Sequence, residues 1–352
     1  MLRIPARALA ACFAAFLTSC SSASLQNQGA LPNAQLDRPN AVERSSVNNL
    51  YLLNFPSRGS GYVSVYANGT SRVLYEIKNG ITNASSIILD PTGNLYVYNP
   101  PLNGTNCIIV FAKGTSKRLY TINGGSDYLG TPAIDGQGNL YVPHPRDNQI
   151  LVYGSGSKKV IRKIRKDADV PGAMSFDSHD NLYVLTADST IVEYAAGTDR
   201  PIRILNIGTS DPYELATDAS NNLYVAIYSQ RTEQYSIAVF GPSGSKPERT
   251  ITNGIVAPGE MAFDSAGSLY LLNGNGITVY APGASSPSLS FDKTSAQPIG
   301  MQIDAADNLY VAYYSKGPFG VGSFKVFALN PNKLVRKVSR DVDQPFSLAV
   351  GP

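Results

Sequence analysis

An eight-residue segment recurs through most of the chain and constrains the fold more than any other feature. At residues 90–97 it reads Asp-Pro-Thr-Gly-Asn-Leu-Tyr-Val. With Asn94 as its marker, equivalent positions return at intervals of 40 to 46 residues. The markers are Asn49, Asn94, Asn139, Asn181, Asn222, Ser268 and Asn308. Seven units of this length are typical of the blades of a β-propeller.

Each unit carries the signals of four short strands. An apolar strand precedes a turn, and the Leu-Tyr-Val strand follows that turn. A third strand ends in an aromatic residue, and a more polar fourth strand completes the unit, as in residues 71–77. Four such strands form an antiparallel meander with two partly apolar faces, so neighbouring units must stack. The sequence therefore predicts an all-β fold, a seven-bladed β-propeller of four-stranded antiparallel blades.

The first unit lacks an innermost strand, because it begins directly at the Asn-Leu-Tyr-Leu segment of residues 49–52. A matching strand lies at the other end of the chain, where residues 345–350 read Pro-Phe-Ser-Leu-Ala-Val. We therefore expect the C-terminal strand to complete the first blade and close the ring. The propeller domain is predicted to span residues 47–352.

In six units an Asp lies four residues before the marker, which raises the question of a metal site. A calcium-binding loop needs alternating oxygen ligands that end in Glu, and that spacing is absent from the sequence. An Asp that starts a turn accepts hydrogen bonds from backbone N–H groups. We interpret these residues as turn formers and predict neither a metal nor a cofactor.

The N-terminal residues have the pattern of a targeting signal. Arg3 and Arg7 precede an apolar stretch at residues 9–17 that is too short to span a bilayer. The Leu-Thr-Ser-Cys sequence that ends at Cys20 resembles the bacterial lipobox. This resemblance implies a signal peptide at residues 1–19 and acyl chains on Cys20 that anchor the protein to a membrane. The alternative is an ordinary secretory signal.

Residues 20–46 are polar and show no apolar periodicity, which predicts a flexible tether. Together with the lipobox, this segment implies an extracytoplasmic protein that is lipid-anchored in the bacterial cell envelope, either in the periplasm or at the cell surface. The net charge of +3 is too small to favour nucleic acid as a partner. We expect a monomer whose partners, besides the membrane, are a glycan, a peptide or an envelope protein.

The consensus Pro-x-x-Met-x-Phe-Asp-x-x-Gly-Asn-Leu-Tyr-Val resembles the NHL-type propeller repeat and related surface-protein repeats with a Tyr-Val-x-Asn core. The resemblance covers residues 49–352 and implies the fold, but such propellers include binding modules, sensors, lactonases and lyases. Lactonase-type propellers hold a divalent metal with Glu, Asn and Asp, and lyases use a central histidine. This chain matches neither set, so we assign no catalytic residue.

The loops that follow the second strands are candidates for a ligand-binding face. The spacing from the marker to the third strand is longest in the first, second, fifth and seventh units. These loops carry aromatic residues that could stack on sugars or hold peptide side chains. The candidates are Tyr98, Tyr228, Tyr314 and Phe319. Alternatively, the rings cap the blade ends against water.

The third position of each innermost strand is expected to open toward the same face. Around the ring this position includes Ser86, Thr131, Glu214 and Glu260. Because Glu214 and Glu260 belong to neighbouring units, they could act as an acid–base pair or bind a cation. The alternative is a solvated acidic patch.

A basic run at residues 158–166 lies on the outermost strand of the third unit. It could contact acidic polymers or lipid headgroups, although charges of this kind more often protect an exposed sheet edge from pairing. Taken together, the sequence predicts a binding or scaffolding module. The alternatives are a lactonase-like hydrolase or lyase that uses Glu214 and Glu260, and a structural envelope protein without a small ligand.

Overall fold

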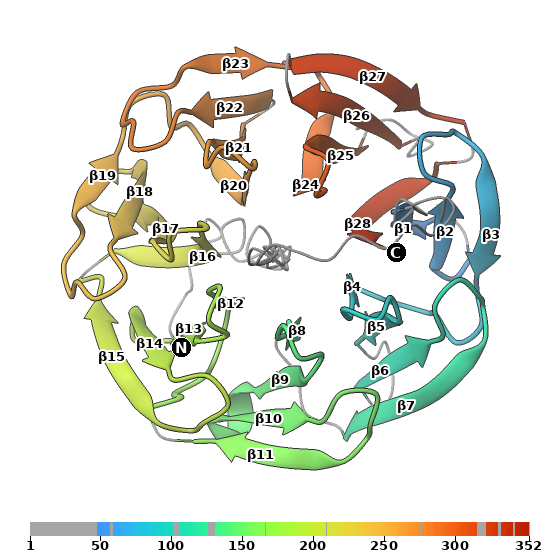
Figure 1. Cartoon of the computed structure of the whole chain (residues 1–352), viewed down its shortest axis with the longest axis horizontal. Coiled ribbons are helices and arrows are strands. Elements are labelled where there is room, and N and C mark those ends of the chain that lie inside the picture. The colour runs from blue at the N-terminus through green and yellow to red at the C-terminus, as the bar shows by residue number, and fades with distance from the viewer. Residues whose placement is uncertain are drawn as a thin grey trace, which may run out of the picture.

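The computed structural model describes residues 48–56, 59–100, 106–125, 131–165, 167–208, 210–274, 276–314, 322–329, 332–340 and 342–351. The predicted signal peptide and tether, with Cys20, and the loop residue Phe319 lie outside these ranges. Among the described residues, no helix is long and apolar enough to cross a membrane. The strands form seven four-stranded sheets arranged in a ring, which confirms the predicted propeller (Figure 1).

Every blade runs from an innermost to an outermost strand in a single antiparallel order. Blade 1 contains β28 (Gln344–Gly351), β1 (Asn49–Phe55), β2 (Tyr62–Tyr66) and β3 (Val73–Ile77). Blade 2 contains β4 (Ser86–Leu89), β5 (Leu95–Asn99), β6 (Asn106–Phe111) and β7 (Arg118–Gly125). Blade 3 contains β8 (Ala133–Ile134), β9 (Leu140–His144), β10 (Gln149–Tyr153) and β11 (Val160–Ile164), with a short 3-10 helix, η2 (Pro145–Asp147), between β9 and β10.

The remaining blades follow the same order along the chain. Blade 4 contains β12 (Met174–Phe176), β13 (Leu182–Leu185), β14 (Thr190–Tyr194) and β15 (Pro201–Asn206). Blade 5 contains β16 (Asp211–Thr217), β17 (Leu223–Ser229), β18 (Gln234–Phe240) and β19 (Arg249–Ile251). Blade 6 contains β20 (Pro258–Phe263), β21 (Leu269–Asn273), β22 (Gly276–Tyr280) and β23 (Leu289–Phe291). Blade 7 contains β24 (Gln297–Ile303), β25 (Asn308–Tyr314), β26 (Ser323–Leu329) and β27 (Asn332–Val338).

The two ends of the propeller meet in blade 1. β28, drawn in red, lies beside β1, drawn in blue, although they come from opposite ends of the chain (Figure 1). The antiparallel register pairs Asn49 with Gly351 and Leu52 with Leu348. The C-terminal strand therefore completes the first blade, as the sequence predicts.

The Tyr of each Leu-Tyr segment explains why this residue recurs. All seven side chains are buried, with at most 4% of their surface exposed. Each ring lies in one of seven clusters of buried apolar residues. Burial of an aromatic side chain there contributes roughly 1.5–3 kcal/mol to stability. They are Tyr51, Tyr96, Tyr141, Tyr183, Tyr224, Tyr270 and Tyr310. The repeated segment is therefore part of the scaffold.

The repeated Asp begins the turn between the first and second strands. Oδ1 of Asp177 accepts the backbone N–H groups of His179 and Asn181 at 2.9 and 2.8 Å. Five further turn residues accept the N–H groups two and four residues later in the same way: Asp90, Asp135, Asp218, Asp264 and Asp304. The predicted role in turn formation is thus confirmed for all six.

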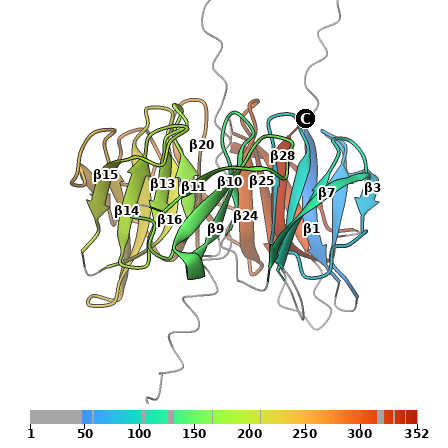
Figure 2. The same cartoon turned by 90° about the horizontal axis from the view of Figure 1, so that it is seen from below.

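Antiparallel pairing separates the connections onto two faces of the ring. The turn face carries the Asp turns and the turns between third and fourth strands. The mouth face carries the loops between second and third strands and the connections from one blade to the next. Figure 2 shows the ring from the side, with the end of β28 at the turn face. Because Asn49 pairs with Gly351, the propeller also begins at the turn face.

The outermost strands form the rim of the ring. In β11 the side chains of Ile161 and Lys163 are exposed, whereas Ile164 is buried. The basic run therefore follows an unpaired sheet edge, where charged side chains disfavour pairing with another chain.

Candidate functional site

The third positions of the innermost strands occupy equivalent places in the blades. Ser86 pairs with Tyr98, and Glu214 pairs with Ala226. In each pair, the partner lies four residues after the marker of its unit. The repeat alignment therefore places Ser86 and Glu214 at one level of the ring. Glu260 lies in a register irregularity of β20 between Pro258 and Met261.

Two side chains at this position connect one blade to the next. Oε2 of Glu260 accepts the backbone N–H of Met301 on β24. In blade 1, Oγ of Ser347 accepts the N–H of Ile87 on β4 at 3.3 Å. The two contacts are equivalent in the repeat. Part of the function of Glu260 is thus to join blades 6 and 7.

Burial also changes the protonation of Glu260. Its side chain is partly exposed by surface area, but loss of hydration raises its pKa to about 8, and the Met301 N–H opposes that rise. Glu260 is therefore mainly protonated at neutral pH. The neighbouring Glu214 is more deeply buried, with 5% of its surface exposed.

Ser86 and Thr131 show where this pattern of contacts is interrupted. The hydroxyl of Ser86 is buried and has no hydrogen-bond partner among the described residues. The equivalent donor in blade 3 falls at Pro132, which has no N–H group. Thr131, directly before Pro132, is half-buried.

The predicted aromatic residues lie in different environments. Tyr98 is 3% exposed and packs in the apolar cluster that includes Ile108 and Val142, so its ring is a core residue. Tyr314 is half-buried at the end of β25. Tyr228 is also half-buried, and it belongs to a group of aromatic residues at the β17–β18 hairpin.

This group contains three tyrosines on the mouth face of blade 5. The rings of Tyr228 and Tyr235 lie 4.9 Å apart, and Tyr213 lies 6.4 Å from Tyr235. Tyr213 also donates a hydrogen bond of 2.8 Å from its hydroxyl to the carbonyl of Pro258 in blade 6. The group therefore occupies the junction of blades 5 and 6, the two blades that carry Glu214 and Glu260.

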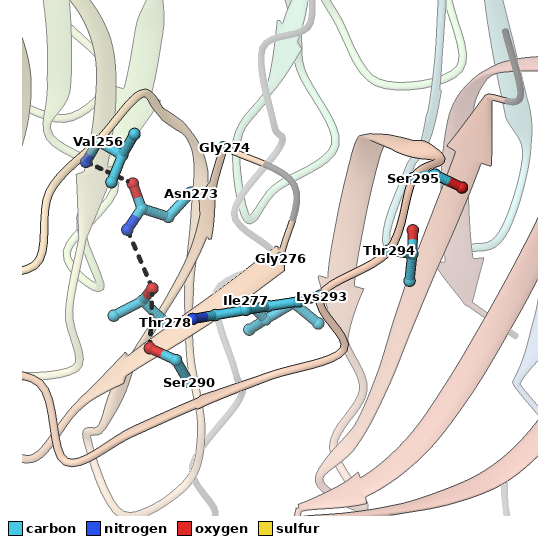
Figure 3. Close-up of a pocket in the computed structure, with 10 residues that line it drawn as sticks. All are labelled: Val256, Asn273, Gly274, Gly276, Ile277, Thr278, Ser290, Lys293, Thr294 and Ser295. Carbon is cyan, nitrogen blue, oxygen red and sulfur yellow. Dashed lines mark hydrogen bonds between the residues drawn. The ribbon is translucent and has the colours of Figure 1, made fainter.

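A cavity of about 620 Å³ opens on the mouth face of blade 6. It lies between the β21–β22 hairpin and the β23–β24 connection (Figure 3). Six of its ten lining residues carry polar side chains, although most of the accessible lining surface is apolar: Val256, Asn273, Gly274, Gly276, Ile277, Thr278, Ser290, Lys293, Thr294 and Ser295. The volume falls in the range of small-molecule binding sites. We call it the blade 6 cavity.

Asn273 holds one wall of the blade 6 cavity in place. Its Oδ1 accepts the N–H of Val256 at 2.8 Å, and its Nδ2 donates to the carbonyl of Gly254 at 2.6 Å and to Oγ1 of Thr278 at 3.0 Å. Asn99 binds the connection into blade 2 in a similar way. The amide of Asn273 is thus fully used within the scaffold, and the hydroxyls of Thr278 and Thr294 also bond within the protein.

A second cavity, of about 450 Å³, lies on the turn face between blades 5 and 6. Its lining includes Asp218, Glu248 and Arg249. Nε of Arg249 is buried and has no hydrogen-bond partner in the described part of the chain. This cavity is bordered by the repeated turns, whereas the blade 6 cavity is bordered by segments that differ between blades.

In the ranges that the structure describes, no group of three or more His, Cys, Asp or Glu side chains is placed to hold a metal ion. No protein-family model matches the chain, and no curated protein matches it at a significant level. The fold and the geometry of the mouth face are therefore what point to a function.

Proposed function

We propose that this protein is an extracytoplasmic, lipid-anchored β-propeller that binds a ligand or a partner protein on its mouth face. The difference between the two faces carries this proposal. On the turn face, six blades repeat the same Asp hydrogen bonds. On the mouth face, the Tyr213–Tyr228–Tyr235 group and the blade 6 cavity each belong to one region of the ring.

The lipobox-like sequence before Cys20 supports membrane anchoring, and the likeness to NHL-type repeats fits a binding module. The propeller begins at its turn face, where Asn49 pairs with Gly351. A lipid on Cys20 would accordingly hold the turn face toward the membrane and direct the mouth face away from it. A tether of this length has a root-mean-square span of roughly 30 Å if it is a flexible coil.

The anchoring is tested by expression of the Cys20→Ser variant. We expect this variant to be released from the membrane fraction, whereas the wild type stays there. Retention of the variant would contradict lipid anchoring.

Ligand binding is tested by thermal unfolding of the full chain in detergent with a panel of glycans and peptides. A ligand at about 100 times its Kd should raise Tm by roughly 4 °C. The increase should be smaller in variants of the mouth face, such as Tyr235→Ala, than in the wild type. If no compound in the panel raises Tm, a structural role in the envelope is favoured.

The alternative function, a hydrolase or lyase, is favoured by one observation. Glu260 has a pKa of about 8 and is thus protonated at neutral pH, as a general acid must be. A metal that copurifies with the wild type and is lost from the Glu214→Gln, Glu260→Gln double variant would favour the enzyme. A metal-free protein stabilised by a glycan or a peptide would favour binding.

A further inference from the structure

Among the described residues that line it, the blade 6 cavity has one cationic side chain and no acidic one. Lys293 is exposed and makes no ion pair or hydrogen bond with any residue that the structure describes. The lining residues include no Asp or Glu. An anionic group in the cavity would therefore meet a positive charge that nothing in the lining compensates.

The carboxylate that is nearest to Lys293 in the sequence, that of Asp292, is neutralised by Lys325. Oδ1 of Asp292 pairs with Nζ of Lys325 at 2.5 Å, and Oδ2 accepts a hydrogen bond from the Tyr313 hydroxyl. The side chains of Asp292 and Lys325 are only 13% and 10% exposed. The charge of Asp292 is therefore balanced by Lys325, and among the described ion pairs Asp292 makes none with Lys293.

The position of the Lys293 side chain depends on the absence of a Cβ atom at Gly276. A Cβ atom at Gly276 would lie 3.2 Å from Cγ of Lys293 and 3.1 Å from the carbonyl oxygen of Phe291. Without that Cβ, the methylene chain of Lys293 lies across the β22 strand. Figure 3 shows its ammonium directed toward Thr278 and Ser290. The ammonium thus lies beside β22 and β23 at the wall of the cavity.

Hydroxyl groups also line the blade 6 cavity, with Ser290 on the same side as the ammonium and Ser295 on the opposite side (Figure 3). Ser290 donates weakly to Thr278, at 3.4 Å, and keeps acceptor capacity, while the exposed Ser295 makes no hydrogen bond with described residues. A volume of about 620 Å³ is much larger than a bare inorganic ion requires. The polar groups of the lining therefore suit the oxyanion and hydroxyl groups of a small molecule, and its apolar surface suits the carbon skeleton that carries them.

We infer that the blade 6 cavity binds a small hydroxylated anion, whose carboxylate or phosphate group pairs with Lys293 and whose hydroxyls bond to Ser290 and Ser295. An acidic sugar has this chemistry, and so does a sugar phosphate. The inference rests on the proposed function, because it names the ligand class of the same mouth face.

The test uses calorimetric titration of the full chain in detergent with three probes: D-glucuronate, inorganic phosphate and D-glucose. We expect D-glucuronate to bind the wild type at least tenfold more tightly than D-glucose. In the Lys293→Gln variant, binding of D-glucuronate should weaken at least tenfold. The matched control is Lys246→Gln, an exposed lysine on the turn face of blade 5, which should leave binding unchanged.

The phosphate titration identifies which part of the ligand is needed. Phosphate binding that depends on Lys293 supports the inference and shows that the oxyanion alone suffices. Weak phosphate binding beside tight D-glucuronate binding also supports it and shows that the hydroxyl contacts contribute. A Gly276→Ala variant, whose new Cβ would press on Cγ of Lys293 and on the Phe291 carbonyl, should weaken binding less than Lys293→Gln does, because the charge remains.

Two results would overturn the inference. One is the absence of binding of both anions to the folded wild type. The other is equal affinity in the wild type and in Lys293→Gln. Neither result would remove the proposed function, because a glycan or peptide that raises Tm in a manner sensitive to Tyr235→Ala would still show binding on the mouth face.

Discussion

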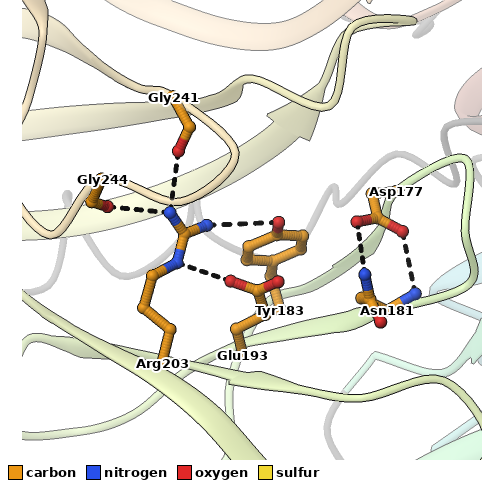
Figure 4. A network of polar contacts seen from close by, with 7 residues as sticks. All are labelled: Asp177, Asn181, Tyr183, Glu193, Arg203, Gly241 and Gly244. Atoms are coloured by element: carbon orange, nitrogen blue, oxygen red, sulfur yellow. Dashed lines mark hydrogen bonds and ion pairs between the residues drawn. The ribbon is translucent and has the colours of Figure 1, made fainter.

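Arg203 on β15 donates a hydrogen bond from Nε to Oε2 of Glu193 on β14, at 2.5 Å, across the register of the sheet (Figure 4). Nη1 of the same Arg203 donates to the carbonyls of Gly241 and Gly244 in blade 5, at 2.7 and 2.8 Å. Burial raises the pKa of Glu193, and Arg203 opposes that rise. One side chain thus joins a buried carboxylate in blade 4 to the backbone of the next blade.

Three other blades have the arginine without the carboxylate. Val152, Val239 and Val326 pair with Arg162, Arg249 and Arg336 in the register where Glu193 pairs with Arg203. In all three arginines Nε is buried and has no hydrogen-bond partner among the described residues. The position tolerates valine, so blade 4 can be converted to the form of its neighbours.

We predict that Glu193→Val lowers the free energy of unfolding by about 1.5–3 kcal/mol, the cost of one charge-assisted hydrogen bond. Arg203→Met should cost more, about 3–5 kcal/mol, because it leaves the Glu193 carboxylate buried without a cation. Urea unfolding of the two variants measures this order. The reverse order would contradict the assignment of Arg203 as the group that connects the blades.

Removal of β28 should destroy the cooperative fold. Truncation of residues 344–352 takes away the innermost strand of blade 1 and the buried residues Ala349 and Val350. Since the whole stability of a domain is about 5–15 kcal/mol, we expect loss of the sharp thermal transition. Deletion of Pro352 alone is the control and should leave the transition in place. A cooperative transition in the longer truncation would show that ring closure is dispensable.

Glu260 should make stability depend on pH. Its pKa is about 8 in the folded protein against an ordinary value of 4.5, so between these values the folded state binds a proton that the unfolded state has lost. Stability contributed by this group is therefore fully present below pH 4.5 and is lost as pH rises toward 8, with a slope of at most about 1.4 kcal/mol per pH unit.

The Glu260→Gln variant keeps an oxygen that accepts the Met301 N–H but does not titrate. Urea unfolding at pH 5, 6, 7 and 8 should therefore show a flatter dependence in the variant than in the wild type. Identical slopes in the two proteins would mean that Glu260 is ionised throughout this range.

Lys325→Met should destabilise the connection between blades 6 and 7. The change leaves Asp292 with its Tyr313 hydrogen bond but without a cation, which costs about 3–5 kcal/mol for a buried pair. Lys337→Met, on the exposed strand β27, is the control and should change stability by less than about 0.5 kcal/mol. Chemical denaturation measures the free energy of unfolding of both variants. Equal effects would mean that the Asp292 carboxylate is in contact with water.

The fold could be predicted from the sequence because its signals are local and repeated. The turn that begins at Asp90 and the burial of Tyr96 recur in other blades, so each copy supports the assignment of the others. Ring closure was also predictable, since the strand that ends at Gly351 matches a position that is missing before Asn49. Such signals depend only on residues near one another in the chain or on an absent member of a repeat.

The candidate site could be predicted only in part, because it depends on contacts between blades. The innermost-strand pattern identified Glu260, but not that its carboxylate reaches the backbone of Met301 in the next blade. The same pattern could not show that the Ser86 hydroxyl has no backbone N–H donor in blade 3, where the equivalent position is Pro132. From loop length, the longest loops after the second strands were the predicted binding loops. The blade 6 cavity lies instead at the shortest of these loops, around Gly276.

The most direct test of the account is a crystal structure of the full chain soaked with D-glucuronate. We predict ligand density on the mouth face, with the carboxylate within hydrogen-bonding distance of Nζ of Lys293 and a hydroxyl near Ser290. Density confined to the turn face, or an empty blade 6 cavity at saturating D-glucuronate, would contradict the assignment of this cavity as the anion site of the mouth face.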